Sequence, residues 1–177
     1  MNLAETQSGL HDLLRGKPIS QGDDYLDDVR ASDRLDLLRE IVEWWRVFGV
    51  ERTAPLTARL LKRRGRFDEA VSRFVAEQRM SPYLEEIGER FAANARKDPD
   101  ALVAAVASFE WAFMRVKRGD GEAHSVPWPV EPYAVLEALI SGGPLPSIPS
   151  GGPSFLTRIS SEIRGTFVVE RVAQPTR

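Results

Sequence analysis

The chain contains no cysteine and only two histidines. The lack of cysteine excludes disulfides, a thiol nucleophile and a cysteine-ligated metal centre. Transition-metal sites use several His, Cys or carboxylate ligands, so we expect no metal and no cofactor in this chain. A Ser-His-Asp triad would have to use His11, in a polar-flanked helix, or His124, in a Pro/Gly-rich connector. These absences remove the commonest catalytic chemistries.

Sequence motifs for nucleotides, metals and acyl transfer are also missing. There is no Walker A loop, dinucleotide-binding glycine fingerprint, nucleophile elbow or HExxH helix. The chain has no run of about 18 apolar residues, so we expect no transmembrane helix and no membrane partner. Its first residues lack the basic region and apolar core of a signal peptide, and we predict a cytoplasmic protein.

Charge argues against a general affinity for nucleic acid. The formal net charge is -2, whereas nucleic-acid-binding domains are usually basic. The exception is residues 59–66, where five basic residues gather: Arg59, Lys62, Arg63, Arg64 and Arg66. This stretch has two interpretations, a solvated helix end whose cations suit the helix dipole or a surface for an acidic partner. A second charged group, Asp23, Asp24, Asp27 and Asp28, is interpreted as a solvated loop before a helix.

Hydrophobic periodicity predicts a helical N-terminal region. Helices are expected over residues 3–15, from Ser32 to about Phe48 with Gly49 ending it, from Pro55 to near Gly65, over 66–80, from Ser81-Pro82 onward, and from Asp98-Pro99 to about 118. In the second of these, Leu38, Ile41, Trp45 and Phe48 follow a 3-4-3 spacing that predicts a core-facing stripe flanked by Trp44. The prediction is a mainly α protein with a compact five- to six-helix domain at residues 1–118.

The sequence changes character at residue 119. Residues 119–177 hold most of the 12 prolines and begin with a Pro/Gly-rich connector. Residues 133–142 fit either a strand or a helix, and residues 166–172 alternate and are rich in β-branched side chains, which predicts a strand. We therefore predict a separate, small, loop-rich β-containing subdomain over 119–177.

Glu110 stands out because its neighbours on a helical face are apolar. Val106, Ala107, Phe113 and Met114 share that face, so an ionised Glu110 must find a partner or become neutral. One interpretation is a carboxyl group with a raised pKa that acts as an acid or base in a small enzyme. The other is a structural group, an interior ion pair or helix cap that joins two helices. No second catalytic partner is visible, so we favour the structural role.

Three tryptophans are candidate contact residues. Trp is enriched as an anchor in protein interfaces, and we assign Trp44, Trp111 and Trp128 to a partner interface. The alternative for each is packing within the chain itself.

The order of these features resembles a bacterial family first described as a DNA-binding domain. Ser81-Pro82-Tyr83-Leu84 matches its helix start, and Phe109-Glu110-Trp111-Ala112 matches its Glu-containing helix. Residues 135–169 resemble the C-terminal part of the branch with the methanobactin partner protein and the partner subunit of the 3-thia-amino-acid pathway. The resemblance covers about residues 30–172.

The resemblance implies a non-catalytic accessory subunit. Its partner would be a TIM-barrel iron oxygenase, which holds all the iron, forms a heterodimer with this chain and modifies a cysteine of a ribosomally synthesised precursor peptide. The accessory subunit would help to capture that peptide. An exposed strand edge could receive it by strand addition, and the candidate residues are Thr166, Phe167, Val168, Val169, Glu170 and Arg171. The alternative is a DNA-binding transcriptional regulator that uses the basic residues 59–66.

Overall fold

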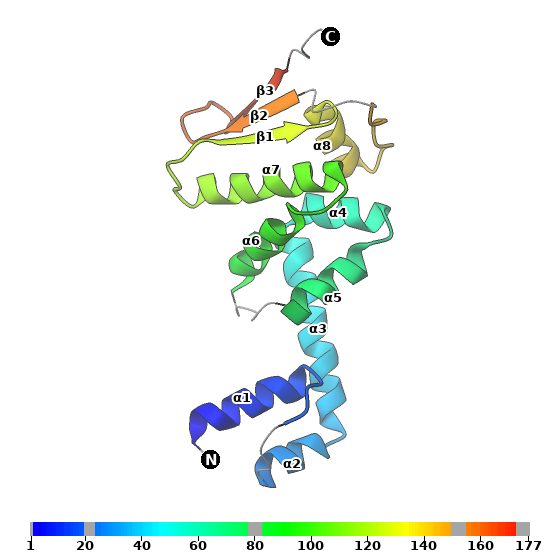
Figure 1. The fold of residues 1–177 in the computed structure, drawn as a ribbon, viewed down its shortest axis with the longest axis vertical. Helices are drawn as coiled ribbons and strands as arrows, with labels where there is room; N and C mark the ends of the chain where they lie inside the picture. Colours follow the sequence, from blue (N-terminus) through cyan, green and yellow to red (C-terminus); the bar gives the residue numbers. More distant parts are fainter. Residues whose placement is uncertain (1, 20–23, 78–82, 150–154, 173–177) are drawn as a thin grey trace. The chain divides into compact units, whose positions relative to one another are not determined.

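The computed structural model describes residues 2–19, 24–77, 83–149 and 155–172. Its elements, in chain order, are α1 (Leu3–Leu14), α2 (Asp24–Arg30), α3 (Arg34–Thr53), α4 (Pro55–Arg63), α5 (Phe67–Glu77), α6 (Leu84–Ala95), α7 (Ala101–Lys117), β1 (His124–Trp128), α8 (Pro132–Ser141), β2 (Phe155–Ile159) and β3 (Phe167–Arg171) (Figure 1). The predicted fold class, mainly α with a small β-containing C-terminal part, is confirmed.

The chain forms two compact units, which differ from the predicted ones. The N-terminal unit comprises Met1–Phe48 and the C-terminal unit Gly49–Arg177, so α3 contributes residues to both. The predicted boundary between residues 118 and 119 does not separate compact units. Residues on the two sides of that boundary belong to one unit because β1 and β2 pack against α7. This contact joins the C-terminal strands to the helices before them.

The N-terminal unit has a small leucine core. Leu13, Leu26 and Leu35 are buried together. A Cβ at Gly9 would lie 2.3 Å from Leu26 Cδ1, so α1 and α2 approach closely only because residue 9 is glycine. Arg39 donates to the Leu13 carbonyl from Nε at 3.1 Å and Nη2 at 2.9 Å, which ties α3 to the end of α1.

The acidic stretch before α3 is not the loop that we predicted. Asp24, Asp27 and Asp28 lie within α2, while Asp23 lies outside the described residues. Acidic residues in a first helical turn interact favourably with the helix dipole, and the buried Leu26 anchors the helix to the leucine core.

The predicted end of the second long helix at Gly49 is also wrong, because α3 continues to Thr53. Gly49 serves helix packing instead: a Cβ there would lie 3.2 Å from Ile87 Cδ1. Gly88 on α6 faces Thr53 even more closely, since its Cβ would lie 2.1 Å from Thr53 Oγ1. The two glycines therefore allow close contact between the end of α3 and α6.

Helix termini in the C-terminal unit follow local capping chemistry. Pro55 occupies the first turn of α4 as predicted. The N-cap of α7 is Asp100, whose Oδ1 accepts from the Leu102 N–H at 2.9 Å, and not Asp98. The ambiguous residues 133–142 are mostly helical. In α8 the Glu131 carboxylate accepts from the Tyr133 N–H, and Gly142 ends the helix with a left-handed φ of 85°.

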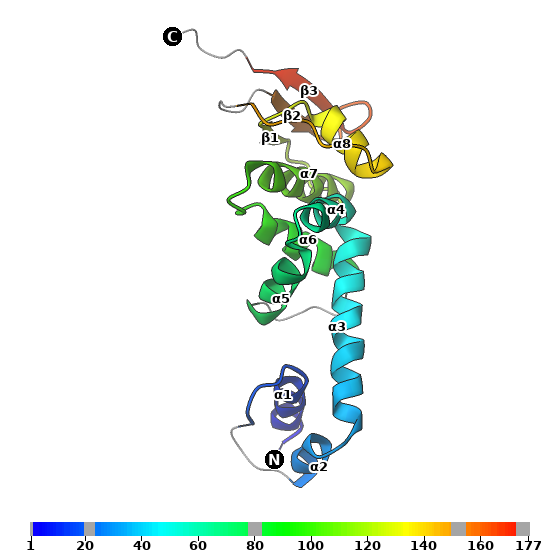
Figure 2. The same cartoon turned by 90° about the vertical axis from the view of Figure 1, so that its right-hand side faces the viewer.

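The three strands form an antiparallel sheet in the order β1-β2-β3. Figures 1 and 2 show the sheet on one side of α7 and α4 on the other. The sheet buries one face, which includes Val126, Trp128, Thr157 and Ile159. The predicted strand at 166–172 is confirmed as β3. In contrast, β1 falls in the segment that we interpreted as a connector, and β2 lies where we predicted no element. The helix start at Ser81-Pro82 lies outside the described residues.

Candidate functional site

Glu110 on α7 caps the N-terminus of α4. Its Oε1 accepts from the Leu56 N–H at 2.7 Å, and its Oε2 accepts from the Thr57 N–H at 2.8 Å. Both donors lie in the first turn of α4, where backbone N–H groups have no partner within the helix. Glu110 therefore joins two helices, as the structural interpretation requires, through backbone donors and not through an arginine side chain.

The environment of Glu110 disfavours its charge. The residue is only 7% exposed, and this burial raises the pKa of its carboxyl group above the ordinary value. The bonds from Leu56 and Thr57 and the charge of Arg59 oppose that rise in pKa, and desolvation is the larger effect. The carboxyl group thus combines a firm structural position with burial that disfavours its charged form.

An open apolar groove lies beside Glu110. Its volume is about 810 Å³, and it is walled by α7, α8, β3 and the junction of α3 and α4. Phenylalanine, leucine, isoleucine, methionine and tyrosine side chains make up most of the lining. The lining residues are Arg52, Thr53, Pro55, Leu56, Phe109, Glu110, Phe113, Met114, Tyr133, Leu136, Glu137, Ile140, Ser141 and Phe167.

Strand β3 is an edge strand in the described part of the chain, since it pairs with β2 alone. The Ser160 N–H donates to the Thr166 carbonyl at 2.9 Å, in register with the β2–β3 ladder. Because hydrogen-bonded pairs alternate along an antiparallel ladder, the N–H and C=O groups of Phe167, Val169 and Arg171 point away from β2. The outer edge of β3 is therefore a row of backbone donors and acceptors.

The β3 edge and the groove meet at Phe167. Its ring lies 5.1 Å from that of Phe109 and 5.6 Å from that of Tyr133. Cross-strand partners share a sheet face, so Phe167 and Val169 face α7 together with Ile159 and Thr157. Among the predicted peptide-binding residues, the structure places Phe167 in the groove and Val169 and Arg171 on the same face.

The other three predicted residues lie differently. Val168 and Glu170 occupy the opposite face of the sheet and are exposed. Thr166 precedes the strand with a φ of 76°, a left-handed conformation in the turn between β2 and β3. Only half of the predicted set therefore shares a sheet face with the groove.

The three predicted interface tryptophans have three different environments. Trp44 is 61% exposed. Trp111 is partly buried, with the Arg96 guanidinium 4.0 Å from the centre of its ring. Trp128 has no exposed surface, because the pleat of β1 directs it under the sheet, where its ring lies 5.9 Å from that of Phe109. The assignment of Trp128 to a partner interface is therefore wrong, since a fully buried side chain offers no surface.

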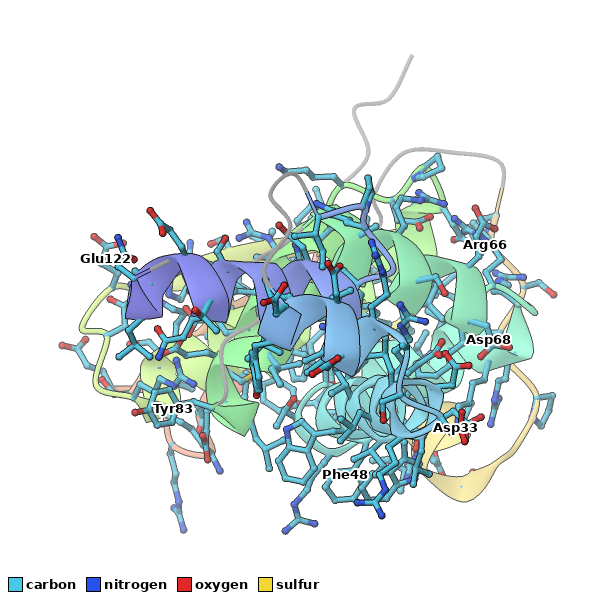
Figure 3. The ribbon with its side chains drawn as sticks, turned by 90° about the horizontal axis from the view of Figure 1, so that it is seen from below. Asp33, Phe48, Arg66, Asp68, Tyr83 and Glu122 are labelled. Carbon is cyan, nitrogen blue, oxygen red and sulfur yellow. The ribbon has the colours of Figure 1, made fainter. Side chains whose placement is uncertain are left out.

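The stripe predicted to face the core in the second long helix is exposed instead. Leu37, Leu38, Ile41, Trp44 and Trp45 are exposed, and Phe48 is partly buried, on what we call the α3 apolar face. The rings of Trp44 and Phe48 stack with their centres 5.3 Å apart. Figure 3 looks along α3 and shows Phe48 projecting outward. The spacing indicates one shared face of the helix, but that face is exposed, and α3 contributes Leu35 to the leucine core.

The five basic residues of 59–66 have partners within the C-terminal unit. Arg63 donates to the carbonyls of Ala138 and Gly143, each at 2.7 Å, and Arg59 donates to the Leu139 carbonyl at 3.2 Å. These three carbonyls lie at the C-terminal end of α8, where cations are favoured. Lys62 pairs with Glu51.

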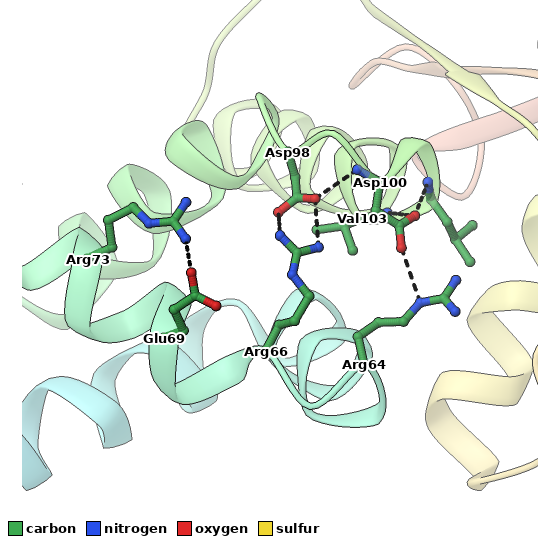
Figure 4. Close-up of polar contacts among 8 residues, drawn as sticks. Arg64, Arg66, Glu69, Arg73, Asp98, Asp100 and Val103 are labelled. Atoms are coloured by element: carbon green, nitrogen blue, oxygen red, sulfur yellow. Dashed lines mark hydrogen bonds and ion pairs between the residues drawn. The ribbon is translucent and has the colours of Figure 1, made fainter.

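The remaining two arginines bind the start of α7. Arg66 makes two parallel bonds to Asp98, at 2.9 and 2.8 Å, and Arg64 Nε lies 3.1 Å from Asp100 Oδ2 (Figure 4). The basic stretch therefore holds α4 to α7 and α8. It is neither a simple solvated helix end nor a row of unpaired cations.

Two features are absent from the described residues. No three His, Cys, Asp or Glu side chains converge there to hold a metal ion. No described helix is both long and apolar enough to cross a membrane.

The residues of α8 that line the groove were not predicted as site residues from the sequence. Tyr133, Leu136 and Ile140 lie in the segment that fitted either a strand or a helix. The available signal was Glu131-Pro132 before it and Gly142 after it, a helix-capping residue, a first-turn proline and a terminating glycine.

Comparison with known proteins adds no assignment. No family model, curated protein or solved structure matches this chain.

Proposed function

We propose that this chain is a non-catalytic partner subunit that captures an extended peptide for an iron-dependent oxygenase. The observation that carries the proposal is the open edge of β3 beside the apolar groove, with Phe167 common to both. The resemblance described above supplies the class of enzyme, a TIM-barrel iron oxygenase, and the substrate, a cysteine of a ribosomal precursor peptide.

Strand addition explains why the two features are adjacent. A peptide that pairs with β3 would bond to the outward N–H and C=O groups of Phe167, Val169 and Arg171, which gives affinity without demanding a sequence. Every second side chain of that peptide would lie on the α7 side of the sheet, where the groove begins. Affinity from the backbone and selectivity from the groove together suit the recognition of a leader segment.

The α3 apolar face is our candidate for enzyme docking. Interface cores are rich in aromatic side chains, and three of the six residues of this face are aromatic. Trp44, the most exposed of them, keeps the interface role that we assigned from sequence. Partly buried Trp111 is a weaker candidate because arginine and histidine side chains already surround its ring.

The substitution Val169→Pro tests peptide capture directly. The Val169 N–H points away from β2, so proline removes an outward donor while the β2–β3 ladder keeps its bonds. We expect Val169→Pro to weaken binding of the precursor peptide by at least about tenfold in a fluorescence anisotropy titration. The matched control, Val169→Thr, keeps the N–H and the β-branched shape and should bind like the wild type. Equal peptide binding by the proline and threonine variants would contradict strand addition.

No described contact favours the DNA-binding alternative. All five basic side chains of 59–66 already have partners inside the chain. A DNA-binding protein would show affinity for duplex DNA that falls steeply with salt. We expect no shift of duplex DNA even at low salt.

A further inference from the structure

We propose that the groove beside β3 receives a lysine or arginine side chain of the captured peptide, with its aliphatic stem on the aromatic wall and its cationic head near Glu110 and Glu137. This inference rests on the proposed function, because the added strand delivers the side chain. It assigns a ligand chemistry to the groove that an apolar lining alone does not specify.

The walls suit the stem of a long basic side chain. Phe109, Phe113, Met114 and Phe167 present apolar surface, and two of the phenylalanines stack with ring centres 6.0 Å apart. Lysine and arginine bury their methylene groups along such surfaces while the charged head reaches a polar group. Aromatic faces also attract the cation itself.

The charges of the groove favour a cation. Its described lining contains two carboxylates, Glu110 and Glu137, and one guanidinium, Arg52. Arg59, the other positive charge that acts on Glu110, donates Nη1 to the Leu139 carbonyl. The described hydrogen bonds of Glu110 come from two neutral N–H groups, so a positive head from the ligand would complete its neutralisation.

The Glu110 carboxyl group would disfavour an uncharged peptide side chain in the groove. A purely apolar side chain that filled the groove would remove the remaining solvent from Glu110 without offering a donor, and burying an unpaired charge is costly. A cationic head replaces the lost solvation and adds a charge-assisted hydrogen bond. The discrimination between lysine and an uncharged side chain of similar length therefore comes from Glu110.

A peptide strand paired with β3 would direct a side chain toward the groove. Phe167 belongs to both the edge strand and the groove lining, so a peptide residue that pairs beside it starts at the mouth of the groove. Alternation along the added strand directs that residue toward α7, the helix that carries Glu110.

The test compares two blocked heptapeptides that alternate threonine and valine around a central lysine or a central methionine. Binding is measured by the shift of the Met114 methyl resonance in the full-length chain. We expect the lysine peptide to bind at least about tenfold more tightly than the methionine peptide, and Glu110→Gln to remove that preference. Equal affinities for the wild-type chain would overturn the inference and leave strand addition standing.

Two further variants keep the test independent of folding. Glu137→Gln changes an exposed carboxylate at the rim and should reduce the lysine preference even if Glu110→Gln does not fold. Glu85→Gln, an exposed position on α6 outside the groove, makes the same change in net charge and should leave the preference intact. An equal effect of Glu85→Gln and Glu137→Gln would show that only overall charge matters, which contradicts the inference.

A small probe separates the groove from the strand edge. Hexylammonium, which cannot add to a sheet, should shift the Met114 methyl resonance more strongly than hexanol does. If hexylammonium binds but neither peptide does, the preference of the groove for a cation stands, whereas its delivery by strand addition is contradicted. If hexylammonium and hexanol act equally and neither peptide binds, both proposals are contradicted.

Discussion

At the scale of single residues, Glu110 shows how one buried carboxyl group serves two purposes. It satisfies two N–H groups at the start of α4, which fixes that helix against α7. It also places an ionisable carboxyl group on the wall of an apolar groove, where its pKa is raised because burial disfavours the charged form. The sequence predicted the apolar surroundings and the structural role, but not the partners, because helix periodicity places Glu110 on a face without showing what lies opposite.

Glu110 should make stability depend on pH with a definite sign. Its pKa in the folded chain is raised above the ordinary value of 4.5, so between these two values the folded state holds more protons than the unfolded state. The stabilising contribution is therefore complete in acid and is lost as pH rises through the raised pKa. Glu110→Gln, which leaves one of two N–H groups without an acceptor, should lower the free energy of unfolding by about 1–3 kcal/mol.

The measurement is urea denaturation of both proteins across the acidic to neutral range. The stability advantage of the wild type over Glu110→Gln should narrow as the pH rises. An advantage that widens with pH would show that the N–H bonds outweigh burial and that the pKa of Glu110 is lowered.

At the scale of elements, local signals in the sequence predicted some starts and strands correctly and some helix ends wrongly. Pro55 correctly marked the start of α4, and the alternation of 166–172 correctly predicted β3. By contrast, Gly49 was expected to end α3, whereas it lies inside the helix at a close contact with Ile87. In the sequence alone, a glycine that permits close contact between helices cannot be distinguished from one that ends a helix. The position of the neighbouring helix is needed to tell them apart.

The β elements were harder to predict for a related reason. β1 contains Pro127, which cannot donate to a ladder and reads as a connector, yet an edge strand tolerates it. Trp128 and Val126 of β1 are buried because the strand packs against α7, and this packing could not be predicted from the strand's own sequence. Strand pairing links residues that are about 30 apart, such as Trp128 and Phe155, and no local signal carries that information.

Arg63 is expected to act on one element, α8. Replacement by methionine keeps much of the apolar stem but removes the donors to the carbonyls of Ala138 and Gly143. Because the guanidinium is exposed, we expect a loss of only about 1 kcal/mol in the free energy of unfolding, with faster hydrogen exchange concentrated in the last turn of α8.

The matched control is Arg73→Met. Arg73 pairs with Glu69 one turn away on α5, a kind of pair that contributes at most about 0.5 kcal/mol. Similar exchange rates in α8 for both variants would contradict the capping role of Arg63.

At the scale of the whole molecule, three surface features of the described residues suit the binding of a partner. The groove, the open β3 edge and the α3 apolar face are each built from side chains or backbone groups that bind partners. The cations that first pointed to DNA are used instead to hold α4 against α7 and α8. The proposed role as a peptide-binding subunit rests on the first two of these features, and the proposed docking of an enzyme rests on the third.

Trp44 tests the docking surface. Because its side chain is largely exposed, Trp44→Ser should change the free energy of unfolding by no more than about 0.5 kcal/mol. If the α3 apolar face docks the enzyme, the same change should weaken the complex by at least about tenfold, measured by interferometry with immobilised enzyme. Leu3→Ser, at an exposed apolar position on α1, is the control and should bind the enzyme normally. Equal enzyme affinity of both variants would contradict this use of Trp44.

The central claim is that this chain is the peptide-binding partner of an iron oxygenase. The most direct measurement is co-expression with a TIM-barrel iron oxygenase from the same genome, followed by size-exclusion chromatography with metal analysis, with and without the precursor peptide. The account predicts a one-to-one complex in which all the iron belongs to the enzyme and to which the peptide binds. Separate elution of the two proteins, even with peptide present, would contradict it.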